Sequence, residues 1–438
     1  MNTTTTFHIR TISPIHIGCD EVYEPMSFVI DEQNDVLVSF DPTDFLKGLD
    51  DQGRLRFSEI CKKGTVESIL EIYRFMRGRN CLGHRVNICP GFKKHYQETL
   101  SISPKDGRRI RRELNSFVIS RTAFNPVTNQ PYLPGSSIKG ALRTAWLNLK
   151  QKEKKLQPKG ASRARELEQE LLDGGSFSTD PFRTVKVSDF MPVGEVKTRI
   201  VYAVNEKKKV STYKARGLAQ IVEVIEPGSV FEGSISISSP LKESRIVSPV
   251  DIQGLMDSAV RFYLGEKDAE DKILVEIGAK PVKAEVPDRG FILRIGRHSG
   301  AECLTIEGHR SIRIMKGKPP GKLERSTTLW LSAQDRRVSI ETPGVPFGWV
   351  SVSPGPASVQ KTVGTAPQKS PVENILDELA HIKPHEMGRI GTVIQMAEKL
   401  PDVRDRAAVA AAIREKIGPK VFKKHKRREL LEEWLKGE

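Results

Sequence analysis

Short apolar runs separated by polar turns predict β-strands near the start of the chain. Residues 7–17 are rich in apolar side chains, and residues 27–30 and 36–40 flank the polar stretch 31–35. Two apolar runs on either side of a short polar turn are typical of a β-hairpin. The first forty residues are therefore predicted to be mostly strand.

Apolar residues recur at helical spacing in four further places. They predict helices over residues 41–49, 58–76, 137–149 and 251–264. Asp41 offers the first of these helices a side-chain oxygen that can accept a free backbone N–H at the helix start. Residues 77–112 show no clear period and are predicted to be irregular and basic.

Strand-like alternation returns in the second half of the main region. Apolar positions of 231–237 alternate with Glu and Ser, and further strands are predicted at 291–295 and 327–331. Residues 351–371 are rich in Pro, Ser, Gly and Thr, which predicts a linker, and residues 372–438 are predicted to be a helical, basic tail. Strands and helices without strict alternation favour an α+β fold.

Charge narrows the classes of partner. The chain has 70 Lys and Arg against 55 Asp and Glu, a net charge of +15. Such a balance favours polyanionic partners, nucleic acid before an anionic membrane surface. No run of 18 apolar residues predicts a membrane span. The N-terminal residues lack the apolar core of a secretory signal, and the five cysteines are irregularly spaced, so we expect a cytoplasmic location without disulfides.

The strongest local signal is PYLPGSSIKGALR, residues 131–143. Its residues of interest are Gly135, Ser136, Ser137, Lys139 and Arg143. The glycine lets the backbone turn, one of the two serines is predicted to cap the helix, and the two cations share a helix face. Free N–H groups and cations at a helix start favour a phosphate ligand. The alternative is an ordinary capped helix.

A second candidate is LRIGRHSG, residues 293–300, where a predicted strand enters a loop that contains Gly296, Arg297, Ser299 and Gly300. Glycines allow close backbone approach, and amides with an arginine can hold a phosphodiester. A simple β-turn is the alternative interpretation.

A third candidate is His16, which lies between two isoleucines just before Gly18. It is either a general base or, more often for such a residue, a packed strand histidine with one satisfied nitrogen.

A metal site at Cys61, Cys81, His84, Cys89 and His95 is left open, because the short paired spacings of zinc sites are incomplete. No metal and no cofactor is expected. Three basic clusters, 108–112, 207–209 and 423–428, favour nucleic acid when taken together.

The order of these motifs resembles that of RAMP-superfamily CRISPR-associated proteins. The matching segments are SPIHIG, NPVTNQPYLPGSSIKGALRTA, DPFRTVKVSDF, LRIGRHSGAE, TTLWLS and PFGWVSV, which span about residues 7–352. Within that family, the chain looks most like the subunit that caps the 3′ end of the guide RNA in the type III-A (Csm) effector complex. The tail lies outside the resemblance.

The resemblance implies an RRM-like (ferredoxin-like) core in residues 1–350, with a helical insertion at about 45–115 and a second β-rich part at about 184–350. It also implies RNA-binding residues, carried over onto Gly18, Gly135, Ser136, Ser137, Lys139, Arg143, Gly296, Arg297, Ser299 and Gly300.

The implied function is a non-catalytic subunit that binds the 3′ part of the guide RNA and docks on the repeated RAMP backbone subunit of the effector filament. It would support guide maturation and antiviral defence, with no membrane partner. A host trimming nuclease is a further partner that the tail could recruit. The alternative is a metal-independent RAMP endoribonuclease that processes the guide precursor, with His16 as its general base.

Overall fold

The structure is a computed structural model. It describes residues 2–79, 81–158, 164–211, 215, 217–314, 321–339 and 341–357, and in the C-terminal part 372, 375–376, 379, 382, 387–398, 400 and 403–436. The chain divides into two compact units, Met1–Ser358 and Val359–Glu438. Helices and strands mix in the first unit and the second is helical, which confirms the α+β prediction.

The first sheet of the main unit is antiparallel throughout. Its order is β12-β17-β1-β11-β7, and β8 also pairs with β11. The bounds are β1 Asn2–Thr11, β7 Val185–Val187, β8 Met191–Pro192, β11 Val230–Ser238, β12 Phe291–Arg294 and β17 Trp349–Pro354. Strand β17 continues into the range predicted as linker because Pro354 is in register with Phe7 on β1. The rest of the predicted linker, from residue 358, lies outside the described residues.

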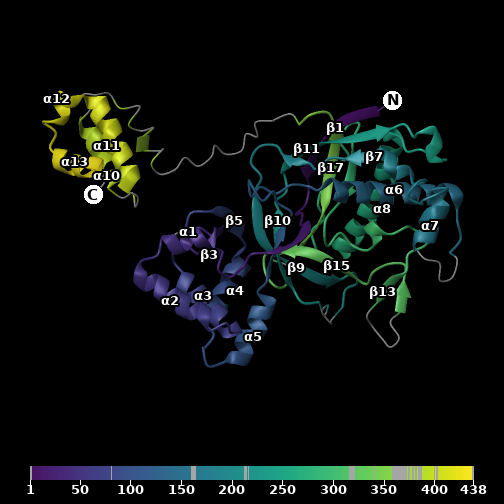
Figure 1. Ribbon diagram of the computed structural model, residues 1–438, viewed down its shortest axis with the longest axis horizontal. Coiled ribbons are helices and arrows are strands. Elements are labelled where there is room, and N and C mark those ends of the chain that lie inside the picture. The colour runs from purple at the N-terminus through teal and green to yellow at the C-terminus, as the bar shows by residue number, and fades with distance from the viewer. Residues whose placement is uncertain are drawn as a thin grey trace. The chain divides into compact units, whose positions relative to one another are not determined.

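Two long helices pack with this sheet around the largest apolar core. They are α6, Gly135–Lys154, and α8, Ile252–Glu276, and Figure 1 shows them beside β1, β11 and β17. Both are longer than predicted. The Asp251 side chain accepts a 2.8 Å hydrogen bond from the Gly254 amide and so begins α8.

A second sheet has the order β2-β6-β10-β9-β5-β4-β3, with β15 on β9 and β16 on β15. The bounds are β2 Gly18–Val22, β3 Phe28–Asp31, β4 Val36–Ser39, β5 His84–Ile88, β6 Ile119–Thr122, β9 Thr198–Lys207, β10 Gln220–Ile225, β15 Thr328–Ala333 and β16 Val345–Pro346. The β3–β4 hairpin was predicted, and the Asp31 carboxylate tightens its turn by accepting the Gln33 and Asn34 amides. A separate two-stranded antiparallel sheet pairs β13, Ile312–Ile314, with β14, Gly321–Leu323.

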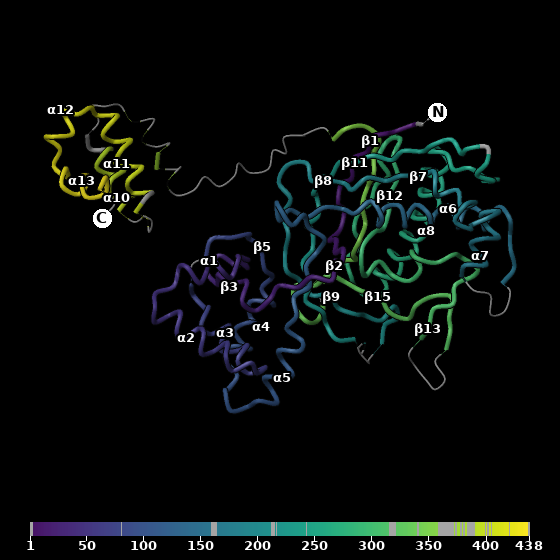
Figure 2. The backbone as a smooth tube through the Cα atoms, viewed as in Figure 1, coloured from purple at the N-terminus to yellow at the C-terminus, as the bar shows by residue number. Residues whose placement is uncertain are grey.

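A helical lobe is inserted between β2 and β6. Figure 2 traces the chain from β2 into this lobe, whose helices are α1 Pro42–Lys47, α2 Asp51–Lys62, α3 Val66–Met76, α4 Pro90–Leu100 and α5 Gly107–Ser116. The helix predicted over 58–76 is therefore two helices, and the irregular structure predicted for 77–112 is wrong. Helix α5 escaped prediction because only Ile110 and Leu114 are buried among its basic residues.

Shorter elements complete the main unit: helix α7, Ala164–Leu171, and the 3-10 turns η1 Pro181–Thr184, η2 Lys242–Ser244 and η3 Glu302–Leu304. Within the described part of the chain, no helix combines the length and the apolarity needed to cross a bilayer.

The C-terminal unit has an apolar core of its own. Helices α10 Met387–Ala397, α11 Val403–Ile417, α12 Pro419–Phe422 and α13 Arg428–Lys436 surround buried side chains that include Val409, Ile413 and Trp434. The predicted helical character of the tail is confirmed, and its helices pack together as a small bundle.

Candidate nucleic-acid interface

Backbone hydrogen bonds bring four distant segments side by side. The Arg297 amide donates to the His16 carbonyl at 2.7 Å, and the next carbonyl, of Ile17, accepts the Ala123 amide at 2.7 Å. The Ala123 carbonyl in turn accepts the Tyr132 amide at 3.2 Å. Two bonds between Leu133 and Phe190 extend the row. The structure therefore joins the histidine motif, the glycine loop and the approach to α6, which the sequence separates by more than a hundred residues.

The glycine loop has a backbone that its sequence requires. Gly296 adopts φ = 84°, and a Cβ atom there would lie 2.6 Å from the His16 carbonyl oxygen. No L-side chain fits both the conformation and the space. Ser299 is buried, and its hydroxyl donates to the carbonyls of Ile295 and Gly296 at 2.9 and 2.7 Å. Ser299 therefore holds the loop together from inside.

The exposed part of this junction consists of Gly18 and Arg297. The Cδ and Nη1 atoms of Arg297 lie 3.9 Å from the position of a Gly18 Cβ. Among the described residues, no carboxylate forms an ion pair with this guanidinium. A bare glycine backbone beside an exposed arginine leaves room for a phosphodiester to approach closely.

His16 lies directly beneath Gly18 and is fully buried. Its Nδ1 is 2.8 Å from the Glu223 carbonyl oxygen, which can only accept, so Nδ1 is the donor. The other ring nitrogen, Nε2, is buried without a hydrogen-bond partner in the described structure. Burial lowers the pKa of His16, as does the nearby Arg297 charge. The ring is thus neutral, with an internal anchor, as the packed-histidine interpretation expects.

His298 packs beside His16 at the base of the loop. The two rings stack at 6.2 Å, and His298 also contacts the rings of Trp330 and Phe347 at 4.8 and 5.2 Å. Burial, with smaller contributions from His16 and Arg297, lowers the pKa of His298 to about 3. The floor of the junction is therefore uncharged, and the positive charge sits on its surface.

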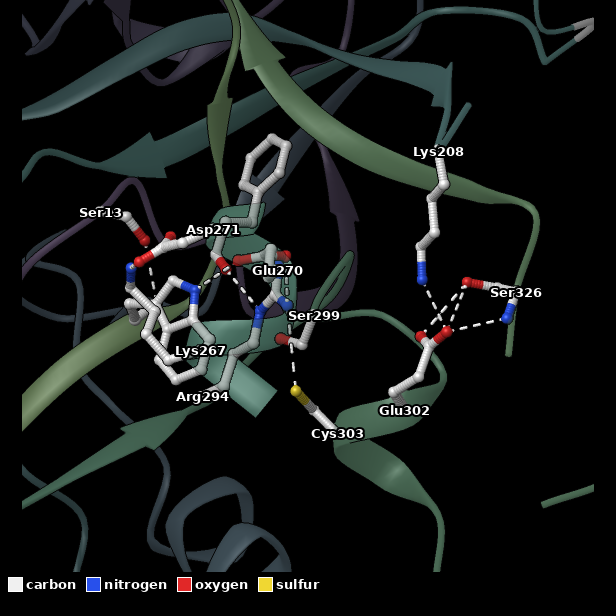
Figure 3. A network of polar contacts seen from close by, with 12 residues as sticks. Ser13, Lys208, Lys267, Glu270, Asp271, Arg294, Ser299, Glu302, Cys303 and Ser326 are labelled. Carbon is white, nitrogen blue, oxygen red and sulfur yellow. Dashed lines mark hydrogen bonds and ion pairs between the residues drawn. The ribbon is translucent and has the colours of Figure 1, made fainter. Parts of the chain in front are cut away.

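A buried charge cluster supports the loop from below (Figure 3). The guanidinium of Arg294 pairs with Glu270 at 2.6 Å, donates to the Phe347 carbonyl at 2.9 Å and lies over the Trp349 ring. The other Glu270 oxygen accepts the Trp349 indole N–H at 2.8 Å. These bonds fasten β12, β17 and α8 together at the point where the glycine loop leaves β12.

A second ion pair closes the far side of the loop, as Figure 3 also shows. Lys208 pairs with Glu302 at 2.6 Å, and the same carboxylate accepts the amide and hydroxyl of Ser326. One cation of the predicted basic cluster 207–209, Lys208, is therefore neutralised by an ion pair within the protein.

The start of α6 differs from the prediction. The N-cap residue is Pro134, so neither Ser136 nor Ser137 caps the helix. Instead, the carboxylate of Asp189 accepts the Gly135 amide at 2.8 Å. A Cβ on Gly135 would lie 2.4 Å from the Val187 carbonyl oxygen, so the glycine allows α6 to meet the β7–β8 segment. The helix end that was predicted to hold a phosphate thus already contacts a carboxylate.

Both cations of the α6 motif have internal partners. Lys139 donates to the Val185 carbonyl at 2.7 Å. Arg143 pairs with Glu168 at 2.7 Å and with Asp180 at 2.9 Å. These bonds attach α7 and the DPFRT segment to α6. Of the two serines of the motif, Ser136 is exposed and Ser137 is half-buried.

Sequence reasoning missed an arginine beside the junction. Arg121 lies 3.4 Å from the ring centroid of Phe124 and 4.8 Å from that of Tyr23. Its charge helps to offset the buried Glu223, whose carboxylate accepts the Thr122 amide at 3.2 Å and whose pKa is raised by burial. The only sequence signal is an acid, Glu223, flanked on both sides by apolar residues in the strand QIVEVI.

The candidate metal ligands are spread over the helical lobe. Cys61 and Cys81 pack on one apolar cluster, whereas Cys89 belongs to another. His95 Nδ1 is 2.9 Å from the Tyr202 hydroxyl. Among the described residues, no three His, Cys, Asp or Glu side chains come together as a metal site.

The other two basic clusters are on the surface. Residues 108–112 lie on α5, and residues 423–428 join α12 to α13 in the C-terminal unit. In the latter, Arg427 pairs with Glu398 and Arg428 with Glu432, while Lys423, Lys424 and Lys426 are exposed.

The sequence matches the model of the RAMP superfamily over residues 8–279. A curated protein of Methanocaldococcus jannaschii, CRISPR system Cms protein Csm5, is 27% identical over 211 residues, or 45% of this chain and 46% of that protein. The chain thus aligns with about half the length of this relative.

Two solved structures are also similar. One is a chain in the cryo-EM structure of a Csm–crRNA–target RNA ternary complex of a type III-A CRISPR-Cas system, 18% identical with a TM-score of 0.49, covering 80% of this chain and 100% of that one. The other is the crystal structure of T. onnurineus Csm5, 18% identical with a TM-score of 0.45, covering 78% and 99%.

Proposed function

This chain belongs to the RAMP superfamily, and on that premise we propose that it is a non-catalytic RNA-binding subunit of a type III-A CRISPR effector ribonucleoprotein. It caps the backbone filament and binds the 3′ part of the guide RNA. The observation that carries the proposal is the junction of Gly18 with Arg297, where an exposed cation stands beside bare backbone on an uncharged floor. Such a surface suits the sugar–phosphate backbone.

The predicted RNA-binding residues divide into two groups. The contact group is accessible or forms the loop backbone: Gly18, Ser136, Ser137, Gly296, Arg297 and Gly300. The positioning group is held by internal contacts: Gly135, Lys139, Arg143 and Ser299. The second group shapes the surface that the first group presents.

The position of His16 supports a non-catalytic role. A general base must reach the proton that it removes, and His16 is fully buried. Its Nδ1 is committed to the Glu223 carbonyl, and its lowered pKa makes the ring a weaker base. For the endoribonuclease alternative, His16 would have to become accessible and its hydrogen bond to the Glu223 carbonyl would have to break.

The partners follow from the proposed role. A capping subunit docks on the neighbouring repeated RAMP subunit and holds the guide RNA. The C-terminal unit, with its separate core, is a candidate for recruiting a trimming nuclease.

Purified protein mixed with end-labelled guide-precursor RNA tests the proposal. Mobility shift and cleavage are followed together in EDTA, in Mg²⁺ and in Mn²⁺. We expect a shift without cleavage in all three. Cleavage that His16→Ala abolishes while binding persists would establish the endoribonuclease instead, and the absence of any shift would refute RNA binding by the free chain.

A further inference from the structure

The exposed side of α5 is strongly cationic. Arg108, Arg109 and Arg112 lie on the helix at spacings of three and four residues, and Lys105 is in the turn just before it. All four side chains are exposed, whereas Ile110 and Leu114 are buried on the other side. Residues three and four apart are neighbours on a helix surface. The four cations therefore form one continuous face, called the α5 face below.

The α5 face is held rigidly. Ile110 and Leu114 belong to the apolar core of the lobe and the second sheet. The Asp106 carboxylate accepts the Arg109 amide at 3.1 Å and caps the helix. Arg111, on the flank, pairs with Glu67 of α3 at 2.9 Å. A ligand would meet cations whose backbone is already ordered, so the backbone loses little conformational entropy on binding.

The acids around this face are already engaged. Glu67 pairs with Arg111, and Glu98 pairs with Arg336 at 2.6 Å. Glu113 lies 3.6 Å from Arg112. In the described part of the chain, Lys105, Arg108 and Arg109 have no ion-pair partner. Residues 42–117 hold sixteen Lys and Arg against nine Asp and Glu. The excess of positive charge on the α5 face therefore extends to the whole lobe.

The chemistry of the α5 face favours a duplex over a single strand. Residues 101–116 contain no aromatic side chain on which unpaired bases could stack. A double-stranded RNA hides its bases and is recognised by its shape, its phosphates and its 2′-hydroxyls. Arg108 and Arg112 are separated by one helical turn, a rise of about 6 Å, which allows both to contact one phosphate strand.

We propose that the α5 face binds the sugar–phosphate backbone of an A-form RNA duplex. The inference rests on the proposed function for the source of that duplex, the guide paired with its target strand. The contact is independent of base sequence and separate from the Gly18–Arg297 junction. The subunit thus holds unpaired guide at one place and paired guide at another.

A charge-matched pair of triple variants tests this inference in the full chain. One carries Lys105→Gln, Arg108→Gln and Arg109→Gln. The control carries Arg261→Gln, Lys272→Gln and Lys280→Gln, three exposed cations on and just after α8 that have no ion pair among the described residues. Both variants lose three charges. The probes are a blunt RNA duplex of about 16 base pairs, the footprint of a typical double-stranded-RNA module, and one of its strands alone.

Affinity for each probe is measured from low to high KCl. For the duplex, we expect the slope of log affinity against log salt to fall by roughly two to three in the α5 variant, since each lost phosphate contact removes about one. The slope for the single strand should change by less than about one. The control should change neither slope.

If the salt slope for the duplex is unchanged in the α5 variant, the inference is overturned. An acidic protein surface would then be the partner that fits the α5 face. An equal loss for the single strand, or an equal loss in the control, also overturns the inference, because the effect would then be general electrostatics. The proposed function is tested separately with Arg297→Ala. If this variant binds the guide RNA as well as the wild-type protein does, the proposed function fails, whatever the result for the α5 face.

Discussion

The backbone amide of Arg297 donates a 2.7 Å hydrogen bond to the carbonyl oxygen of His16. This bond places an exposed guanidinium over a turn that lies 281 positions earlier in the chain. The bond brings the histidine motif and the glycine loop, each a weak signal in the sequence, together on one surface. Both the proposed contact with RNA and the stability of the loop depend on this junction, and each leads to a measurable expectation.

Arg297→Ala should weaken RNA binding and lower its salt slope by about one, the loss expected for one phosphate contact. Lys272→Ala, which removes one exposed charge from α8, is the control and should leave the slope within error. Filter binding of a single-stranded guide over a KCl series measures both. Equal slopes for the two variants would place the phosphate elsewhere.

Gly296→Ala should destabilise the main unit strongly. The left-handed backbone costs an L-residue roughly 1–2 kcal/mol, and the added Cβ also meets the His16 carbonyl. We expect a total above about 3 kcal/mol in urea unfolding. Gly194→Ala is a matched control, because Gly194 has φ = 81° with nothing within 4 Å of its Cβ position. The Gly194→Ala variant should therefore show the free-energy cost of the left-handed backbone alone. If the two variants lose equal unfolding free energy, the glycine loop relaxes away from the His16 carbonyl.

Arg294→Met should destabilise the protein by about 3–5 kcal/mol, since it leaves the Glu270 carboxylate buried without its cation. Adding Glu270→Gln should recover part of this loss, because the amide is neutral and its oxygen can still accept the Trp349 indole N–H. The double-mutant cycle is read from unfolding midpoints. A double variant no more stable than the single one would show that packing, rather than charge, dominates this cluster.

Stability should fall as pH drops below about 6.5. Burial lowers the pKa of His298 to about 3, so between these values the unfolded chain binds a proton that the folded chain does not. Each such histidine removes up to about 1.4 kcal/mol per pH unit within that window. His298→Asn tolerates the left-handed backbone at this position and removes the proton uptake. The loss in unfolding free energy from pH 7 to pH 5 should be smaller in this variant, and an unchanged loss would assign the effect to other groups.

Deletion of residues 372–438 should leave guide binding by the main unit intact, because the C-terminal unit has its own core. If this unit recruits a trimming nuclease, guides recovered from the assembled complex should end at a different 3′ position. Sequencing of co-purified guides measures this. Unchanged 3′ ends would remove the recruitment hypothesis while leaving the role of the main unit standing.

Local signals predicted local structure well. The Asp41 cap was predicted, and the Asp41 carboxylate accepts the Thr43 amide at 2.7 Å. The cap on α6 was predicted wrongly, because its acceptor, Asp189, comes from 54 residues away. Nothing in PGSSIKG reveals that the helix start meets another segment. The partners of Lys139 and Arg143 were not predicted for the same reason, because they also come from segments distant in the sequence.

The candidate site was only partly visible in the sequence. Its glycines and Arg297 were found because glycine-rich turns with cations have a recognisable composition. Arg294 and Glu270 were missed as partners, since a buried ion pair depends on which strand and helix pack together. The order of the motifs along the sequence carried the resemblance to RAMP proteins, and the structure supplied the contacts between the motifs.

The position of β1 in the sheet constrains the order in which the protein forms during synthesis. This first strand pairs with β17, and Phe7 is in register with Pro354, so its partner is translated 347 residues later. At roughly 5–20 residues per second, the ribosome needs on the order of 20–70 s to supply it. Until then β1 has an unpaired edge, and the Gly18–Arg297 junction can form no earlier than the translation of Arg297, 281 positions after His16. If the proposed function holds, a nascent chain presents the Gly18–Arg297 surface only after most of the main unit has been translated.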